Sequence, residues 1–115
     1  MRVDGKLDYL EMIAGDTAEA KRFYGAAFGW TFQDYGPTYA AFSEGLDGGF
    51  DADGAAGAPP LPVLYATDIE AALKRVTEAG GVIVKPIFDF PGGRRFHFRD
   101  PSGNELAVWS EPPAA

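Results

Sequence analysis

Residues 16–30 read DTAEAKRFYGAAFGW, and this stretch sets the pattern for the first half of the chain. Its apolar side chains recur with the spacing of one helix face, at Ala20, Phe23, Tyr24, Ala27 and Phe28. Asp16 stands before this stripe and Glu19 follows three residues later, which is the spacing of an N-terminal capping pair. Gly29 is suited to end the helix because glycine readily adopts a left-handed backbone. The stretch therefore predicts one amphipathic helix of about three turns.

The second half of the chain repeats this pattern. Asp68 lies 52 residues after Asp16 and precedes a second helical stripe, which Gly80 and Gly81 close. The apolar positions of this stripe are Ile69, Ala72, Leu73 and Val76. Each helix follows one β-like segment and precedes two or three more, so the chain reads as a duplication. We expect an α+β fold with the helices on one side of a sheet.

The strands are predicted from alternation of apolar and polar residues. The expected segments are Tyr9–Ile13, Thr31–Asp34, Thr38–Phe42, Leu46–Phe50, Leu61–Ala66, Val82–Lys85, Arg94–Arg99 and Glu105–Ser110. The residues between Asp51 and Pro60 are rich in glycine, alanine and proline and are expected to form a linker. The chain is thus interpreted as one domain over residues 1–115, with a first module at about 7–50 and a second at about 61–110.

Composition narrows the possible functions. The 115 residues carry a net charge of −7, which disfavours a nucleic-acid partner. There is no cysteine, so disulfides, thiolate metal sites and thiol nucleophiles are excluded. His97 is the single histidine. No apolar run reaches the length of a membrane span and no signal peptide is evident, so we expect a cytoplasmic protein without a membrane partner.

Two motifs resemble a known family. Residues 23–30 read FYGAAFGW at the end of the first helix, and residues 100–104 read DPSGN before the last strand. Together they resemble the vicinal oxygen chelate superfamily, which includes glyoxalases, bleomycin resistance proteins and dioxygenases, over Leu7 to Trp109. The resemblance implies two βαβββ modules, a cup-shaped and mostly antiparallel sheet, helices on its outer side, and a homodimer.

The resemblance also implies where a metal would bind, and this sequence departs from that pattern. Family enzymes hold one divalent metal through ligands on the first and last strands of each module. The corresponding positions here carry Tyr9, Leu61 and Ala107, while the last strand of the first module offers Asp47 but no glutamate. A catalytic metal site needs about three nitrogen, oxygen or sulfur ligands. We therefore expect no metal and no other cofactor.

Strand alternation predicts which side chains would line the cup. The expected ligand-binding residues are Tyr9, Glu11, Phe50, Leu61, Val63, Tyr65, Glu105, Ala107 and Trp109. Leu64, Ala66, Leu106 and Val108 should face the second helix instead. Such a cup would be rich in aromatic side chains and would carry one or two carboxylates, which suits an amphipathic small molecule. Glu11, Tyr9 and His97 are the candidates for proton transfer.

Charge is uneven along the chain and suggests the kind of ligand. Residues 1–56 carry a net charge of −6, whereas residues 57–115 carry −1. The surplus of acids is explained either by solubility or by attraction of a cationic compound. The first hypothesis is a metal-independent protein that binds, and sequesters, a cationic or aromatic small molecule. The alternatives are a glyoxalase-like lyase or isomerase using Glu11, Tyr9 or His97, and an accessory module without a ligand.

Overall fold

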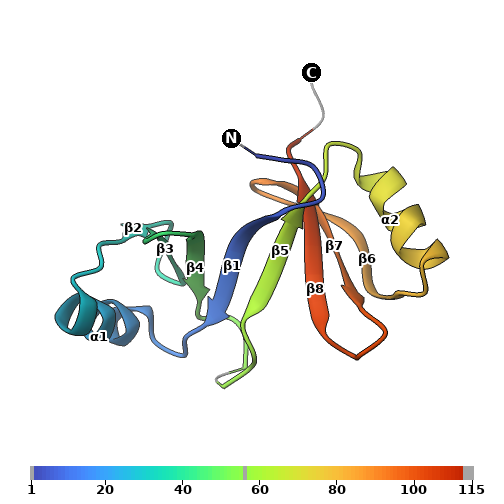
Figure 1. Ribbon diagram of the computed structural model, residues 1–115. Helices are drawn as coiled ribbons and strands as arrows, with labels where there is room; N and C mark the ends of the chain where they lie inside the picture. Colours follow the sequence, from blue (N-terminus) through green and yellow to red (C-terminus); the bar gives the residue numbers. More distant parts are fainter. Residues whose placement is uncertain (1, 56, 113–115) are drawn as a thin grey trace. The chain divides into compact units, whose positions relative to one another are not determined.

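The chain folds into two modules, each with one helix and four strands, in a computed structural model that describes residues 2–55 and 57–112 (Figure 1). Its Cα positions group into two compact units. Module 1 is residues 9–61, and module 2 is residues 1–8 together with residues 62–115. The predicted α+β class and the duplicated strand–helix–strands order are confirmed.

Module 1 begins in a strand that its helix follows directly. Its elements are β1 (Leu7–Ile13), α1 (Thr17–Phe28), β2 (Gln33–Asp34), β3 (Tyr39–Ser43) and β4 (Asp47–Asp51). The strand order is β2-β3-β4-β1, in which β1 and β4 are parallel and the other neighbours are antiparallel. The first and last strands of the unit therefore lie side by side.

Module 2 repeats this topology. Its elements are β5 (Leu61–Tyr65), α2 (Ile69–Glu78), β6 (Val82–Phe90), β7 (Gly93–Arg99) and β8 (Glu105–Ser110). The strand order is β5-β8-β7-β6, and again the first and last strands are the parallel pair. The first residue of β5, Leu61, groups with module 1.

Both helices begin at the predicted aspartates. The Asp16 carboxylate accepts hydrogen bonds from the backbone N–H groups of residues 18 and 19, at 2.9 and 3.4 Å. Asp68 accepts one from the N–H of Ala71 at 3.1 Å. Gly29 ends α1 with a φ of 74°, a conformation that favours glycine. Local capping chemistry thus explains why each helix starts directly after a strand.

The two cores differ in composition. In module 2, α2 covers a cluster whose buried members are Ala66, Ile69, Ala72, Phe96, Phe98 and Val108, with Leu64 and Leu106 packed against it. The expected helix-facing side of β5 and β8 is therefore confirmed. In module 1 the core is a set of stacked and tilted rings of Tyr24, Trp30, Phe42 and Phe50.

The prediction that Phe50 lines the cup is wrong. Phe50 is 3% exposed, and its ring centroid lies 5.2 Å from that of Tyr24 on α1. Strand register gives the reason. Phe50 pairs with Met12, so it shares the face of Met12 rather than the face of Glu11.

Two strands differ most in length from the predicted segments. The predicted strand Val82–Lys85 extends to Phe90, through register shifts on either side of Lys85 that interrupt the simple alternation. The predicted strand Thr31–Asp34 is reduced to Gln33–Asp34. Among the residues that the structure describes, no helix is long and apolar enough to cross a membrane.

Candidate functional site

The face of the module 1 sheet that α1 does not cover carries a chain of hydrogen bonds between polar side chains. Tyr9 on β1 and Tyr39 on β3 are hydrogen-bonded through their hydroxyl groups. The Tyr39 hydroxyl also lies 3.5 Å from Glu11 Oε1, to which it donates. We call Tyr9, Tyr39 and Glu11 the tyrosine–glutamate network.

Gly49 on β4 makes this network possible. A Cβ atom at Gly49 would lie 2.3 Å from the Tyr39 hydroxyl, well inside van der Waals contact. The bare backbone therefore lets the Tyr39 ring cross β4 and reach Glu11 on β1. Tyr39 is not among the residues predicted from the sequence, although Tyr39 and Ala41 alternate with the core residues Ala40 and Phe42.

The electrostatics of this face keep both phenols protonated. Burial is the main cause that raises the pKa of Tyr9, and the charges of Glu11 and Asp47 raise it further. Burial also raises the pKa of Tyr39 far above its ordinary range, helped by its hydrogen bond to Tyr9 and by Glu11 and Asp51. The network therefore presents neutral O–H donors beside a carboxylate, within an environment that disfavours further negative charge.

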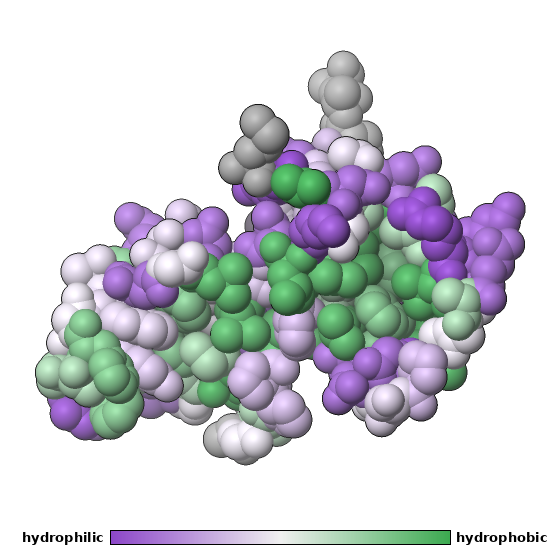
Figure 2. Space-filling view, viewed as in Figure 1, coloured by the Kyte–Doolittle hydropathy of each residue, from purple (hydrophilic) through white to green (hydrophobic). Residues whose placement is uncertain are grey.

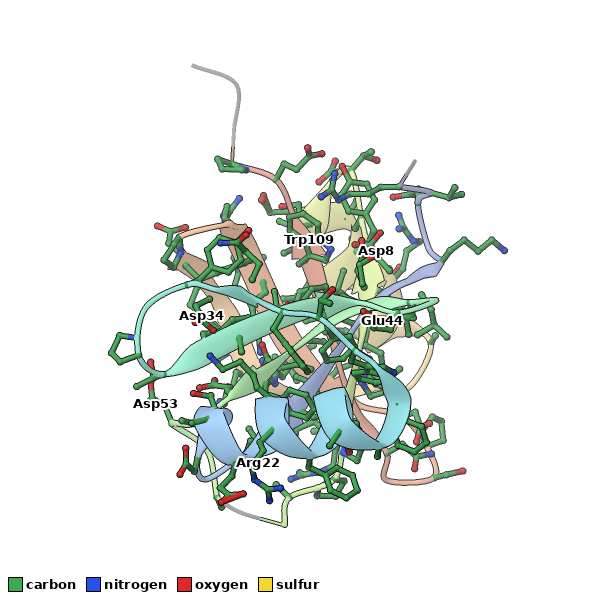
Figure 3. All side chains as sticks on the ribbon, turned by 90° about the vertical axis from the view of Figure 1, so that its left-hand side faces the viewer. Asp8, Arg22, Asp34, Glu44, Asp53 and Trp109 are labelled. Carbon is green, nitrogen blue, oxygen red and sulfur yellow. The ribbon has the colours of Figure 1, made fainter. Side chains whose placement is uncertain are left out.

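Module 1 as a whole is strongly acidic. Residues 9–61 contain eight acidic and two basic side chains, a net charge of −6, whereas module 2 carries −1. The two basic residues lie on α1, where Lys21 pairs with Asp34 at 2.9 Å and Arg22 with Glu19 at 2.8 Å. Arg22, on α1, and Asp34, the partner of Lys21, are labelled in Figure 3. The acidic charge of this module therefore favours cationic ligands.

The corresponding face of module 2 gathers most of its predicted residues. Val63 pairs with Ala107 and Tyr65 with Trp109 across the parallel β5–β8 ladder. His97 on β7 pairs with Ala107 from the other side. These side chains share the face that α2 does not cover, since their neighbours along each strand form the core. The predicted strand face of Val63, Tyr65, Ala107 and Trp109 is thus confirmed. The first three are buried, and a binding role for all four stays a prediction.

His97 is buried in a network with both its ring nitrogens bonded. Arg95 donates from Nε and Nη2 to His97 Nε2, at 3.1 and 3.0 Å. Nε2 must therefore be the acceptor, and Nδ1–H donates to Glu105 Oε2 at 3.0 Å. Burial lowers the pKa of His97, and the charges of Arg95 and Lys85 lower it further against the opposing hydrogen bond to Glu105. The His97 imidazole is therefore neutral, carries its proton on Nδ1 and links β7 to β8.

Two phenylalanine rings pack against this network. The Arg95 guanidinium carbon lies 5.8 Å from the ring centroids of both Phe88 and Phe90, and the Phe88 ring lies 5.9 Å from His97. Phe90 also contacts Trp109 edge-on. Arg95, Phe88 and Phe90 are not among the site residues predicted from the sequence. Arg95 and His97 lie two residues apart on β7, so strand alternation could have placed Arg95 on the same face as His97. The two phenylalanines lie beyond the predicted end of β6, at Lys85.

A shallow hollow of about 380 Å³ lies beside the start of α2. Its lining residues are Thr67, Asp68, Ile69, Glu70, Arg94, Ser110 and Glu111. Its charged groups are engaged with neighbours, since Arg94 pairs with Glu70 at 2.5 Å and Glu111 accepts a hydrogen bond from Tyr65. None of the predicted site residues lines this hollow, so we do not place the site there.

Strand pairing identifies the one metal-ligand position that the sequence left open, on the last strand of module 1. The equivalent residues of the two modules have to be matched first. Glu11 and Val63 each lie five residues before the aspartate that caps their helix. Val63 pairs with Ala107, and Glu11 pairs with Gly49 in the same way. Gly49 is therefore the counterpart of Ala107, and Asp47 is not.

The four positions thus carry Tyr9, Gly49, Leu61 and Ala107, which do not supply a catalytic ligand set. Within residues 2–55 and 57–112, no group of three or more histidine, aspartate or glutamate side chains could hold a metal ion. The residues present do not fit the metal of the family enzymes.

Comparison with known proteins agrees with the fold. The family model described as the glyoxalase/bleomycin resistance protein/dioxygenase superfamily matches residues 6–108, nearly the whole chain. The chain belongs to this superfamily. The resemblance drawn from FYGAAFGW and DPSGN is therefore confirmed.

Two relatives in mycobacteria share one provisional name. The chain is 29% identical over 123 aligned residues to CFP32 of Mycobacterium bovis and Mycobacterium tuberculosis, which is provisionally named a glyoxylase. The match covers 91% of this chain but 45% of CFP32, so the chain spans a little under half the length of these superfamily relatives.

Solved structures share the fold at low sequence identity. A superfamily member from Vibrio splendidus matches with a TM-score of 0.69 and 16% identity, covering 92% of this chain and all of that one. A Legionella pneumophila structure described as an NAD-dependent benzaldehyde dehydrogenase matches with a TM-score of 0.74 and 16% identity, covering 90% and 97%. At such identities the likeness shows the fold alone, and the function has to come from the site.

Proposed function

We propose that this chain is a metal-independent small-molecule-binding domain whose module 1 takes a positively charged aromatic compound. The observation that carries the proposal is the tyrosine–glutamate network. Tyr9 stands at one metal-ligand position, and Gly49 at another leaves room for Tyr39 to reach Glu11. Phenol hydroxyls and a carboxylate replace the missing ligand set at this place in the fold.

The chemistry of this network favours a cation that carries N–H donors. A carboxylate accepts charge-assisted hydrogen bonds from an amidinium or guanidinium group, and two phenol rings offer faces to a flat ligand. The surrounding acids and the net charge of −6 of module 1 oppose an anion. Binding of this kind requires no turnover, so a sequestering role fits the site.

The test uses three ligands of nearly the same shape and different charge. Benzamidinium, benzamide and benzoate are titrated by calorimetry into protein stripped of metal and kept in a chelator. We expect benzamidinium to bind, benzamide to bind more weakly and benzoate not to bind. Glu11→Gln should weaken benzamidinium binding by about tenfold, the loss of one charge-assisted hydrogen bond.

Glu19→Gln is the matched control, since it removes the same charge from α1, where Glu19 pairs with Arg22. It should leave the affinity for benzamidinium unchanged. Benzoate binding as tightly as benzamidinium, or a Glu11→Gln variant that binds like the unmodified protein, would overturn the proposal.

A lyase or isomerase is the second candidate, and one observation favours it. Glu11 is a carboxylate that can remove a proton, and once it is protonated the hydroxyl groups of Tyr39 and Tyr9 can turn their protons toward the resulting oxyanion. His97 is less suited to proton transfer because both its nitrogens are engaged. Exchange of substrate C–H for deuterium in heavy water, lost in Glu11→Gln, would support this candidate over binding alone.

A further inference from the structure

One arginine side chain in module 2, that of Arg2, lies against an aromatic ring and two carboxylates. The guanidinium carbon of Arg2 lies 4.9 Å from the centroid of the Trp109 ring, within the range of a cation–π interaction. Arg2 Nε lies 3.8 Å from Asp8 Oδ2, and Nη1 lies 3.9 Å from Glu111 Oε2. One aromatic face and two carboxylates therefore surround this guanidinium group. Figure 3 shows Asp8 and Trp109 beside each other.

The groups around Arg2 are held in place by other parts of the module. The indole N–H of Trp109 donates to Asp8 Oδ2 at 3.0 Å. The Tyr65 hydroxyl donates to Glu111 Oε1 at 2.5 Å, and the Tyr65 ring packs edge-on against Trp109 with centroids 5.4 Å apart. Both carboxylates and the indole ring are thus oriented by contacts that do not involve Arg2.

The backbone next to Arg2 is also anchored, but Arg2 itself is held weakly. Gly5 N–H donates to the Tyr65 carbonyl at 2.8 Å, and the Asp4 carboxylate accepts from the Thr67 N–H at 2.8 Å. The Arg2 side chain, in contrast, is 50% exposed, and its contacts with both carboxylates are longer than hydrogen bonds. A well-oriented site therefore contains an occupant that a better ligand can displace.

We infer that Trp109, Asp8 and Glu111 form a binding site for a planar delocalised cation, which Arg2 occupies when no ligand is present. An aryl guanidine matches the site in three ways. Its flat face stacks on the indole, its charge is attracted by the carboxylates, and its N–H groups are spaced to reach two acceptors. The inference rests on module 2 alone and stands whether or not module 1 binds its proposed ligand.

The Arg2 side chain competes with any ligand for the face of Trp109, and this competition can be tested. A ligand must displace the Arg2 side chain before it can stack on Trp109, so removing that side chain should raise affinity rather than lower it. An exposed cation–π contact corresponds to a change in the dissociation constant of about two- to fivefold. A site in which Arg2 contributed to ligand recognition would show the opposite change.

The experiment follows the indole N–H resonance of Trp109 by nuclear magnetic resonance in ¹⁵N-labelled protein. The chain has two tryptophans, and Trp109→Phe identifies which of the two indole signals belongs to Trp109. Phenylguanidinium is titrated into the unmodified protein and into Arg2→Gln. We expect the Trp109 signal to shift in both, with a dissociation constant about two- to fivefold lower in Arg2→Gln.

Two controls separate this inference from general charge effects. Lys6→Gln removes one positive charge from the same segment and should leave the affinity for phenylguanidinium unchanged. Phenylurea, the neutral analogue of similar shape, should produce no saturable shift. An Arg2→Gln variant that binds no tighter than the unmodified protein, or a saturable shift with phenylurea, would overturn the inference. Failure of benzamidinium to bind module 1 would leave these results untouched.

Discussion

Module 1 and module 2 follow the same order of one strand, one helix and three strands, yet their helices pack differently. In module 2, α2 buries Ile69 and Ala72 against a core centred on Phe96, which has no exposed surface. In module 1, no residue of α1 is buried, and Phe23 and Phe28 are 52% and 66% exposed. Figure 2 shows apolar surface in the region of α1.

The faces away from the helices differ as well. Module 1 carries two phenols and a carboxylate within an acidic unit. Module 2 carries an Arg95–His97–Glu105 network framed by phenylalanine rings. The duplicated topology thus keeps the strand pairing and the capped helices, while the side chains on the helix-free faces are open to change. The two modules can therefore differ in function through those faces, while they share the framework.

The largest expected effect tests the difference between the two helix packings. Phe96→Ala should lower the free energy of unfolding of module 2 by about 3–5 kcal/mol, because it leaves a cavity in a filled core. Phe23→Ala on α1 should cost less than about 1 kcal/mol, since half of that side chain is already exposed. Urea titration of both variants measures the difference. Equal losses would contradict the described packing.

The next effect concerns Gly49, whose missing side chain leaves room for Tyr39 on the helix-free face of module 1. Gly49→Ala should lower stability by about 1–3 kcal/mol and weaken benzamidinium binding, because the new Cβ displaces Tyr39. Gly25→Ala is the matched control in the same module, since its Cβ would meet Trp30 O at an ordinary 3.6 Å. That variant should be at least as stable as the unmodified protein, because alanine favours a helix over glycine.

A smaller effect is expected from the hydroxyl of Tyr39. Tyr39→Phe removes the group that links Tyr9 to Glu11 and should lower the free energy of unfolding by about 1 kcal/mol. Tyr35→Phe, at a side chain that is 66% exposed, should change stability by less than about 0.5 kcal/mol. Thermal unfolding compares the two. A Tyr39→Phe protein as stable as Tyr35→Phe would show that the network contributes nothing to stability.

The smallest effect is a pH dependence that comes from module 2. Burial lowers the pKa of His97 below its ordinary value of 6.5, so in mildly acidic solution the unfolded chain binds a proton that the folded chain does not. Stability should therefore be complete above pH 7 and fall as the pH decreases through 6.5 toward the folded-state pKa. His97→Gln should flatten this slope between pH 7.5 and 5.5. A slope that stays unchanged would assign it to other groups.

Most of the framework could be predicted from local sequence. Asp16 and Asp68 mark helix starts because capping depends only on the next few residues. Alternation also placed Leu64 and Val108 correctly on the helix side, since side-chain direction follows directly from strand geometry. These signals act over a few residues and need no knowledge of the partner strand.

The remaining features depend on pairings between distant segments. Phe50 was misplaced because its face is set by its register with Met12 on another strand. Phe88 and Phe90 were missed because the shifted register of β6 breaks the alternation that would have revealed them. The contact between Arg2 and Trp109 joins the two ends of the chain, and no local pattern reports it.

The central claim is that module 1 binds its ligand with Tyr9, Tyr39 and Glu11 and without a metal. The most direct measurement is calorimetric titration of benzamidinium into one protein preparation, first in excess chelator and then with Ni²⁺, Zn²⁺, Mn²⁺ or Fe²⁺ added. We predict the same dissociation constant in all conditions and no saturable binding of the metals alone. Ligand binding that occurs only after a metal is added, and stoichiometric binding of that metal, would contradict the claim.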